Sequence, residues 1–254
     1  MAKLGIQLYT VRDYLEKDYA GTVRAIKKTG YDGVEIPGGV MEKMDALQLR
    51  NLLNEQNLAL AGIVFDHNDL INHLEQAVLY CKESHCTTVL YPYIPGDLRR
   101  SEIEFRQTAE QIDDFGKTFA SNGIRMLYHI HGYEFKTVGN VTGMDILLEY
   151  FKPGNVGLEI DVYWVEYGGV SAVKLVEQYA RMSPYIHLKD YSGDFADTEV
   201  GCGSIDIQKI IHTGLSHGTE WFIVEQEKFD KDSMESARIS FDNVRKLLKA
   251  EERQ

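Results

Sequence analysis

The chain has 254 residues, of which 27 are Lys or Arg and 39 are Asp or Glu, so its formal net charge is -12. This negative charge repels the phosphate backbone of nucleic acids, and the basic residues are scattered along the chain, so we expect no nucleic-acid partner. No run of about 18 apolar residues occurs, and the first ten residues lack the apolar core of a signal peptide, so we expect no membrane association.

We expect one domain over residues 1–254, because no Pro/Ser-rich stretch, low-complexity tract or block of like charges divides the chain. The length matches the roughly 250 residues of an α/β barrel. The three cysteines, Cys81, Cys86 and Cys202, lack the spacing of a metal finger. An odd number of cysteines without a signal peptide predicts reduced thiols in a cytoplasmic protein.

Short runs rich in β-branched and aromatic residues predict strands, in chain order, over residues 3–9, 31–37, 58–65, 87–94, 124–130, 155–161, 184–190 and 220–227. Apolar residues at helical spacing predict amphipathic helices over 18–28, 42–55, 68–83, 101–121 and 234–250. Strands that alternate with helices form a parallel sheet. Eight such strands in a domain of this length, with no G-x-G-x-x-G after the first, predict a closed (β/α)8 TIM barrel.

Helix-stopping residues precede several of these strands, so the opposite strand ends face the side of the barrel where such folds carry their chemistry. Ionisable residues gather at those ends in the second half of the chain. They are His129, His131 and Glu134 after the fifth strand, Asp161 after the sixth, His187, Lys189 and Asp190 in the seventh, and Glu225 and Glu227 in the eighth.

The spacing of these residues predicts that they converge, because Glu134, Asp161 and His187 follow one another at about one βα repeat. Two or three carboxylates with one imidazole suit a divalent cation such as Mn²⁺, Co²⁺, Mg²⁺ or Zn²⁺, with positions left for water and a polyol. A single His or Asp at a strand end is more often a surface or capping residue. Four of them on successive strands favour a metal site.

Seven segments resemble the sugar phosphate isomerase/epimerase family, the xylose-isomerase-like TIM barrels, and they occur in that family's order. They are LGIQLYTVRD (4–13), GYDGVEI (30–36), YHIHGYEF (128–135), GLEIDVYWV (157–165), IHLKDY (186–191), GCGSID (201–206) and IVEQE (223–227). Each segment is only moderately specific, but together they span almost the whole chain.

The resemblance implies one divalent metal ion, with Mn²⁺ the first choice, held by Glu134, Asp161, His187 and Glu225. The family's usual string after the fifth strand is close to H-N-H-D-F-E-F, and this chain has Ile130 and Gly132 in place of the Asn and Asp. The lost polar groups leave a second interpretation open, in which His129 is the ligand from this strand and Glu134 lies behind it.

Further residues of these motifs are predicted to contact a small sugar substrate: His129, Trp164, Lys189 and Glu35. Plainer roles compete with this prediction, since Trp164 can be a packing aromatic, and Lys189 and Glu35 can belong to ion pairs. His131 is expected to point to the substrate. Arg99 and Arg100 can seat a phosphate, although an exposed helix start is the favoured interpretation.

The resemblance further implies an isomerase or epimerase whose metal chelates a carbonyl and a neighbouring hydroxyl and stabilises an enediolate. Ketose 3-epimerases of this superfamily move the proton with two metal-bound glutamates, which makes Glu134 and Glu225 the acid/base pair here, assisted by His131. The same site can instead eliminate a leaving group, as in an inosose-type dehydratase or an oxidised-glycoside-cleaving subunit.

Two other classes fit the barrel less well. An endonuclease IV-type repair enzyme needs a three-zinc cluster with more histidines and a basic face, whereas a non-catalytic sugar-binding barrel would not need the metal ligands. The apolar-rich early helices leave room for a homo-oligomer.

Overall fold

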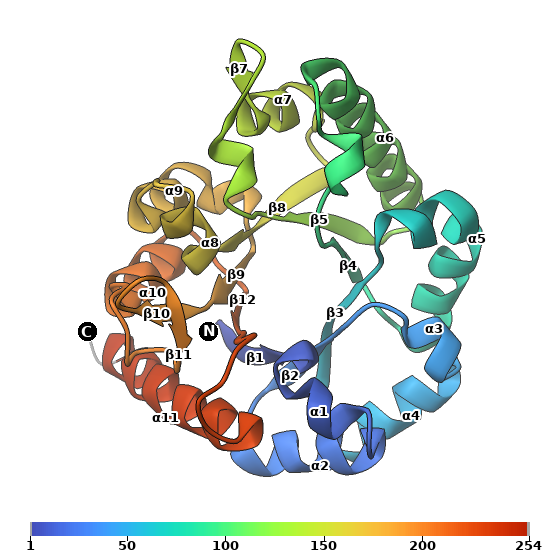
Figure 1. Ribbon diagram of the computed structural model, residues 1–254. Coiled ribbons are helices and arrows are strands. Elements are labelled where there is room, and N and C mark those ends of the chain that lie inside the picture. Colours follow the sequence, from blue (N-terminus) through green and yellow to red (C-terminus); the bar gives the residue numbers. More distant parts are fainter. Residues whose placement is uncertain (1, 253–254) are drawn as a thin grey trace.

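Eight parallel strands close into a barrel in the order in which they occur along the chain (Figure 1). They are β1 (Lys3–Gln7), β2 (Gly33–Ile36), β3 (Ala59–Val64), β4 (Thr88–Tyr91), β5 (Arg125–His129), β8 (Val156–Asp161), β9 (Tyr185–Leu188) and β12 (Trp221–Val224). This computed structural model describes residues 2–252. Each strand lies within one of the ranges expected from the sequence, so the predicted (β/α)8 TIM barrel is confirmed.

Helices cover the outside of the barrel. The α-helices are α1 (Arg12–Leu15), α2 (Tyr19–Thr29), α3 (Val40–Lys43), α4 (Ala46–Glu55), α5 (His67–Ser84), α6 (Glu102–Ser121), α7 (Gly143–Tyr150), α8 (Val162–Tyr167), α9 (Ala172–Tyr179), α10 (Ile207–Ser216) and α11 (Ser233–Glu251). Single 3₁₀ turns are η1 (Leu8–Val11), η2 (Gly96–Leu98), η3 (Tyr133–Phe135) and η4 (Ala180–Met182).

The predicted helices over 18–28, 68–83, 101–121 and 234–250 are confirmed as α2, α5, α6 and α11. The helix predicted over 42–55 is wrong in its continuity, because it is two helices, α3 and α4. Asp45 separates them: its side chain accepts the backbone N–H of Gln48, while Gln48 accepts the N–H of Asp45. This reciprocal capping starts a new helix rather than continuing the old one.

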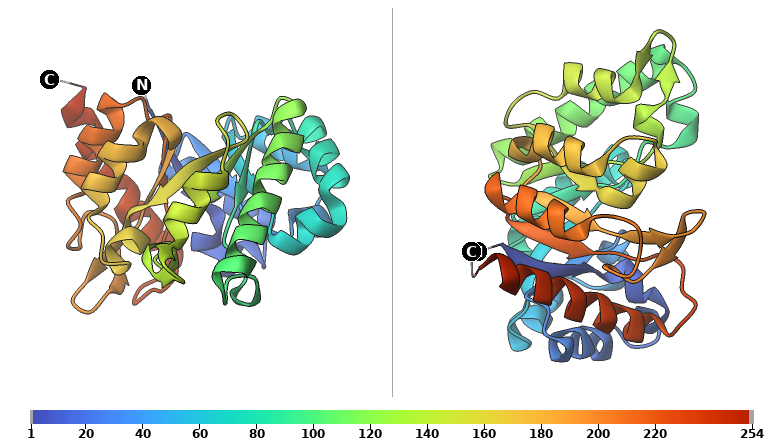
Figure 2. Two further views of the ribbon diagram at one scale, coloured as in Figure 1. Left: turned by 90° about the horizontal axis from the view of Figure 1, so that it is seen from above. Right: turned by 90° about the vertical axis from the view of Figure 1, so that its left-hand side faces the viewer.

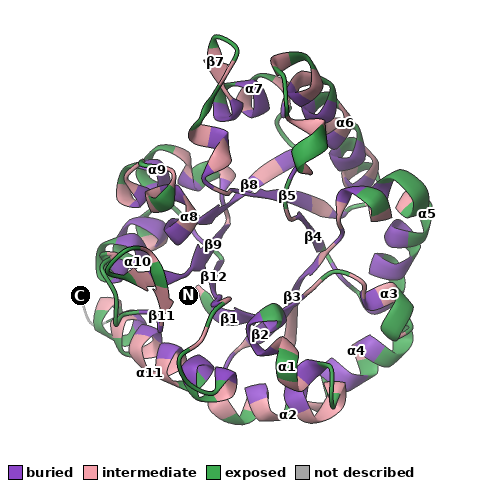
Figure 3. Cartoon of the chain, in the orientation of Figure 1, coloured by how far each residue is buried: buried purple, intermediate pink, exposed green. Residues whose placement is uncertain are grey.

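Alternate side chains of each strand face inward and outward. The inward set packs along the barrel axis and comprises Ala61, Leu90, Leu127, Tyr185, Trp221 and Ile223. The outward set joins the larger apolar layer between strands and helices. The barrel strands are mostly buried, and the exposed residues lie on the surrounding helices and loops (Figure 3). Along β5, Leu127 and His129 therefore point inward and Tyr128 points outward.

Two small hairpins extend from the end of the barrel at which the strands finish. One pairs β6 (Thr137–Val138) with β7 (Val141–Thr142) after β5, and the other pairs β10 (Asp190–Ser192) with β11 (Ala196–Thr198) after β9. They lie opposite the two ends of the chain (Figure 2). No helix within residues 2–252 is both long and apolar enough to cross a membrane.

The loop after β11 is fastened to Asp190, whose side chain is fully buried. Its carboxylate accepts the backbone N–H groups of Gly201, Gly203 and Ile205 at 3.0, 3.0 and 3.1 Å. A Cβ at Gly203 would lie 2.2 Å from Oδ1 of Asp190, so only glycine fits there. This contact gives the segment GCGSID a structural role at the mouth of the barrel.

Candidate active site

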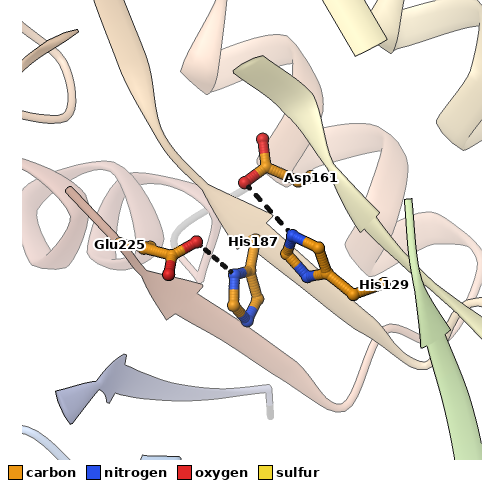
Figure 4. A group of neighbouring side chains, drawn as sticks. All are labelled: His129, Asp161, His187 and Glu225. Atoms are coloured by element: carbon orange, nitrogen blue, oxygen red, sulfur yellow. Dashed lines mark hydrogen bonds and ion pairs between the residues drawn. The ribbon is translucent and has the colours of Figure 1, made fainter. Parts of the chain in front are cut away.

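Four buried side chains from successive late strands converge at the mouth of the barrel (Figure 4). They are His129, Asp161, His187 and Glu225, and they offer ligand atoms that all lie within 4.8 Å of one another. His129 ends β5 and Asp161 ends β8, whereas His187 lies inside β9 and Glu225 directly follows β12. We call these four residues the ligand group.

The atoms of the ligand group lie close enough together for one ion to contact them all. Nε2 of His129 lies 3.8 Å from Oδ2 of Asp161, and Nδ1 of His187 lies 3.2 Å from Oε2 of Glu225. Ligands that bind one cation at about 2.1 Å are typically about 3 to 3.5 Å apart. Oδ1 of Asp161 accepts the N–H of Trp164 at the start of α8, but Oδ2 is buried without a hydrogen-bond partner. A cation would satisfy that oxygen, so the group fits a metal ion.

Two further carboxylates lie behind the imidazoles. Oε2 of Glu159 accepts a hydrogen bond from Nδ1 of His129 at 2.8 Å, and Oε1 of Glu159 lies 3.2 Å from Nε2 of His187. That same nitrogen lies 2.9 Å from Oε2 of Glu35, which also accepts a hydrogen bond from the side chain of Gln7. Such partners fix the orientation of a ligating imidazole. The sequence reasoning missed Glu159, although it precedes Asp161 by two residues and so faces inward beside it.

Burial and neighbouring charges shift the pKa values of the ligand group and of Glu35. Burial raises the pKa of Asp161 to about 7, and burial together with the charge of Glu159 raises the pKa of Glu35 to about 7. Burial and the neighbouring His187 lower the pKa of His129 to about 3, so this imidazole is neutral and keeps a lone pair for a metal. Burial acts to lower the pKa of His187, but Glu159 and Glu35 outweigh it and raise that pKa well above its usual range.

Within the described part of the chain, residues 2–252, Glu134 does not belong to the cluster formed by the ligand group. It lies in η3, fully buried, and its carboxylate accepts hydrogen bonds from the Tyr128 hydroxyl at 2.8 Å and from the backbone N–H of His131 at 3.0 Å. Tyr128 points to the helix side of the barrel wall, so Glu134 is held there too. The structure thus brings Asp161, His187 and Glu225 together with His129.

A cavity of about 400 Å³ opens above the ligand group, and its walls carry both polar and ring side chains. His129, His187 and Glu225 line it, together with Glu35, Glu159, Glu227, His131, Gln7, Tyr9 and Tyr93. The predicted substrate residues His131 and Glu35 therefore do lie at the cavity. Glu35 also forms an ion pair with His187, as the alternative interpretation of Glu35 predicted.

Lys189 and Trp164 lie beside the cavity rather than in its wall. The ammonium group of Lys189 is buried, donates to Oε1 of Glu227 at 2.6 Å and lies 4.8 Å from the ring centre of Trp164. The Lys189 salt bridge to a neighbouring acid is therefore present. Since Glu227 does line the cavity, Lys189 fixes a carboxylate that a substrate can meet.

Comparison with known proteins finds several with the same fold. The chain is 21% identical over 253 residues to the inosose dehydratase of Clostridium beijerinckii, with 84% of this chain and 83% of that protein covered. A sugar phosphate isomerase/epimerase of Parabacteroides distasonis has the same fold, with a TM-score of 0.83, 20% identity, and 95% of this chain and 93% of that chain covered. The IOLI protein, solved with a bound zinc atom, gives a TM-score of 0.77 at 15% identity, with 98% of each chain covered.

The family model described as "Xylose isomerase-like TIM barrel" matches residues 23–247, which include the whole ligand group. The resemblance found in the sequence segments is thereby confirmed, and the chain belongs to the xylose isomerase-like TIM barrel family.

Proposed function

We propose that the protein is a divalent-metal-dependent enzyme that removes the proton from a carbon next to the carbonyl group of a sugar. The observation that carries this proposal is the convergence of His129, Asp161, His187 and Glu225 beneath a cavity large enough for a small polyol. The cavity walls are rich in carboxylates, which hydrogen-bond sugar hydroxyls and repel phosphodiester backbones.

We propose His129, rather than Glu134, as the metal ligand from β5. This was the second interpretation that the sequence left open, and the position of Glu134 beside Tyr128 supports it. Two imidazoles and two carboxylates suit Mn²⁺, Co²⁺ or Zn²⁺ better than Mg²⁺, which prefers oxygen ligands. The zinc atom in the IOLI protein concerns that protein, but it is consistent with this choice.

A divalent cation in the ligand group would supply Lewis acidity, which stabilises the negative charge that develops on a substrate carbonyl when the neighbouring C–H loses its proton. His131 lies at the cavity wall, and burial together with neighbouring His129 lowers its pKa to about 3. Its imidazole is therefore uncharged at neutral pH, which is the protonation state of a general base, although so low a pKa makes it a weak one. Burial opposes the charge of Glu225, but His187 and Lys189 lower its pKa and keep its carboxylate ionised beside the reacting carbon.

Return of the proton gives an isomerase or epimerase, which is the outcome we propose first. The two-glutamate pair of ketose 3-epimerases would require Glu134 at the cation, and this glutamate is held by Tyr128 and His131 instead. That contact, together with the similarity to an inosose dehydratase, supports elimination of water as the second candidate. Both outcomes share the same first proton transfer.

The two outcomes can be separated by incubating the metal-loaded protein with a panel of keto-sugars and inososes in deuterated water. NMR then follows hydrogen exchange and product formation. Exchange with the carbon skeleton and hydroxyl count retained indicates an isomerase or epimerase, whereas loss of water indicates a dehydratase. Asp161→Asn is the matched control, because it removes one carboxylate charge at nearly constant volume.

A protein that binds metal but exchanges no hydrogen with any of these substrates would contradict the proposed reaction. Exchange that is as fast in Asp161→Asn as in the unmodified protein would contradict the proposed site.

A further inference from the structure

A second cavity, of about 360 Å³, opens at the mouth of the barrel next to the central one. Tyr93 and His131 line both cavities, so the two are neighbours that share one wall. Their charges differ. The central cavity carries the carboxylates of Glu35, Glu159, Glu225 and Glu227, whereas the ionisable lining of the second consists of Arg99, Lys136, His131 and tyrosines.

Arg99 is held in place at this second cavity. Its Nε donates to the carbonyl oxygen of Ile94 at 2.9 Å, and its guanidinium lies 3.5 Å from the ring centre of Tyr133. The Tyr133 hydroxyl in turn accepts the N–H of Ile94 and is hydrogen-bonded to the hydroxyl of Tyr128. Ring and guanidinium are therefore fixed before a ligand arrives, while both terminal nitrogens of Arg99 donate to no protein acceptor within residues 2–252.

Lys136 adds a second positive charge to the same cavity, and its ammonium group takes part in no ion pair among the described residues. Trp164 and Tyr167 form a further wall, with their rings in edge-to-face contact at 5.5 Å. Neither Arg99 nor Lys136 has a carboxylate partner among the described residues, so both charges are available to an anion in the cavity. A guanidinium held in place and a second ammonium group beside ring walls suit a planar or tetrahedral anion attached to a sugar.

We propose that this second cavity binds an acidic group of the substrate, a phosphate or a carboxylate, through Arg99 and Lys136. The polyol part of the same substrate then lies in the central cavity, over the ligand group, with His131 between the two parts. This deepens the proposed function, since it names an acidic sugar as the substrate class. The position of the sugar part rests on that function, but anion binding at Arg99 and Lys136 does not.

Calorimetric titration of the metal-stripped full chain tests the proposal without relying on turnover. Fructose 6-phosphate is compared with fructose for the phosphate, and glucuronate with glucose for the carboxylate. Arg99→Gln and Lys136→Gln each remove one charge-assisted hydrogen bond, so each should weaken binding of the acidic sugar about tenfold and leave the neutral sugar unchanged. Arg100→Gln is the matched control, because Arg100 is exposed and does not line the cavity.

A preference for fructose 6-phosphate over fructose identifies phosphate as the anion, and a preference for glucuronate over glucose identifies carboxylate. Equal binding of acidic and neutral sugars by the unmodified chain would overturn the proposal, as would an equal loss in Arg100→Gln. Lys136 is exposed, so its variant should fold even if Arg99→Gln does not. If the proposed function alone fails, the acidic sugars still bind here while the protein binds no metal.

Discussion

Side chains alternate along the end of β5, and this alternation separates His129 from Glu134. His129 points inward and is part of the ligand group. Tyr128 points outward, and its hydroxyl holds Glu134 on that side by a hydrogen bond. The period of two is visible in the sequence, so His129 could be named as an alternative ligand. The position of Glu134 could not, because the turn before it packs closely against α8: a Cβ at Gly132 would lie 3.1 Å from the carbonyl oxygen of Trp164. No sequence pattern reports such a close approach between segments.

His131 is expected to act on substrate rather than on metal. Its imidazole lines both cavities and is not part of the ligand group. His131→Ala should therefore retain the metal and lower turnover by roughly 10²-fold, the usual scale for a proton-transfer group. Metal content and kcat are measured on the same preparation, with the exposed His212→Ala as control. Loss of the metal in His131→Ala would show that this residue is a ligand after all.

Glu159 is expected to position both imidazoles of the ligand group. Its two oxygens lie 2.8 Å from Nδ1 of His129 and 3.2 Å from Nε2 of His187. An amide has only one acceptor oxygen, so it cannot accept hydrogen bonds from both imidazoles. Glu159→Gln should therefore weaken metal affinity roughly 10- to 100-fold while the fold is kept. Metal titration of this variant and of the exposed Glu110→Gln measures the difference. Equal metal affinity in both variants would show that Glu159 does not position the imidazoles.

Glu134 should make the stability of the protein depend on pH. Burial raises its pKa from 4.5 to about 7. The folded state therefore favours the protonated acid. The contribution of Glu134 to the free energy of unfolding is fully present below about pH 4.5 and is lost as the pH rises to about 7, a change of about 3 kcal/mol. Glu134→Gln cannot titrate, so it should gain stability relative to the unmodified chain between these pH values. The free energies of unfolding of the two metal-free proteins are measured in urea at several pH values. If the difference between them does not change with pH, this prediction is wrong.

At the scale of elements, the strands were predictable and the short helices were not. The barrel strands are short apolar runs flanked by turn residues, and burial on both faces gives them a composition that helices rarely share. α8 covers Val162–Tyr167, and its β-branched and aromatic residues have little intrinsic preference for helix. It forms because Asp161, while facing the ligand group, also caps its first turn. That dual role depends on the tertiary structure.

The loop after β11 should loosen when Asp190 is changed. Asp190→Asn replaces one acceptor oxygen by an NH₂ group that faces backbone N–H donors, which should cost about 1–3 kcal/mol of stability. We expect a lower Tm and faster proteolysis within residues 191–206. Asp194→Asn, at an exposed position in the turn between β10 and β11, is the control. Unchanged Tm and proteolysis in Asp190→Asn would mean that this buried carboxylate does not hold the loop.

At the scale of the whole molecule, the number and spacing of the strands predicted a closed barrel and the end of it that carries the ligand group. The family's motifs led us to expect a metal-dependent sugar enzyme. The second cavity required the structure, because Arg99 and Lys136 come from different loops. The homo-oligomer stays a prediction. Leu47 on α4 and Leu79 on α5 expose 49% and 58% of their surface, so each offers an apolar side chain to such a contact.

The most direct test of the metal site is the number of divalent ions bound per chain. Mass spectrometry of metal content after dialysis against Mn²⁺ or Zn²⁺ compares the unmodified protein with Asp161→Ala, His129→Ala and Glu134→Gln. We predict one ion per chain in the unmodified protein and in Glu134→Gln, and at least about tenfold weaker binding in the other two variants. An unmodified protein that binds no divalent ion, or a His129→Ala variant that keeps the ion while Glu134→Gln loses it, would contradict this account.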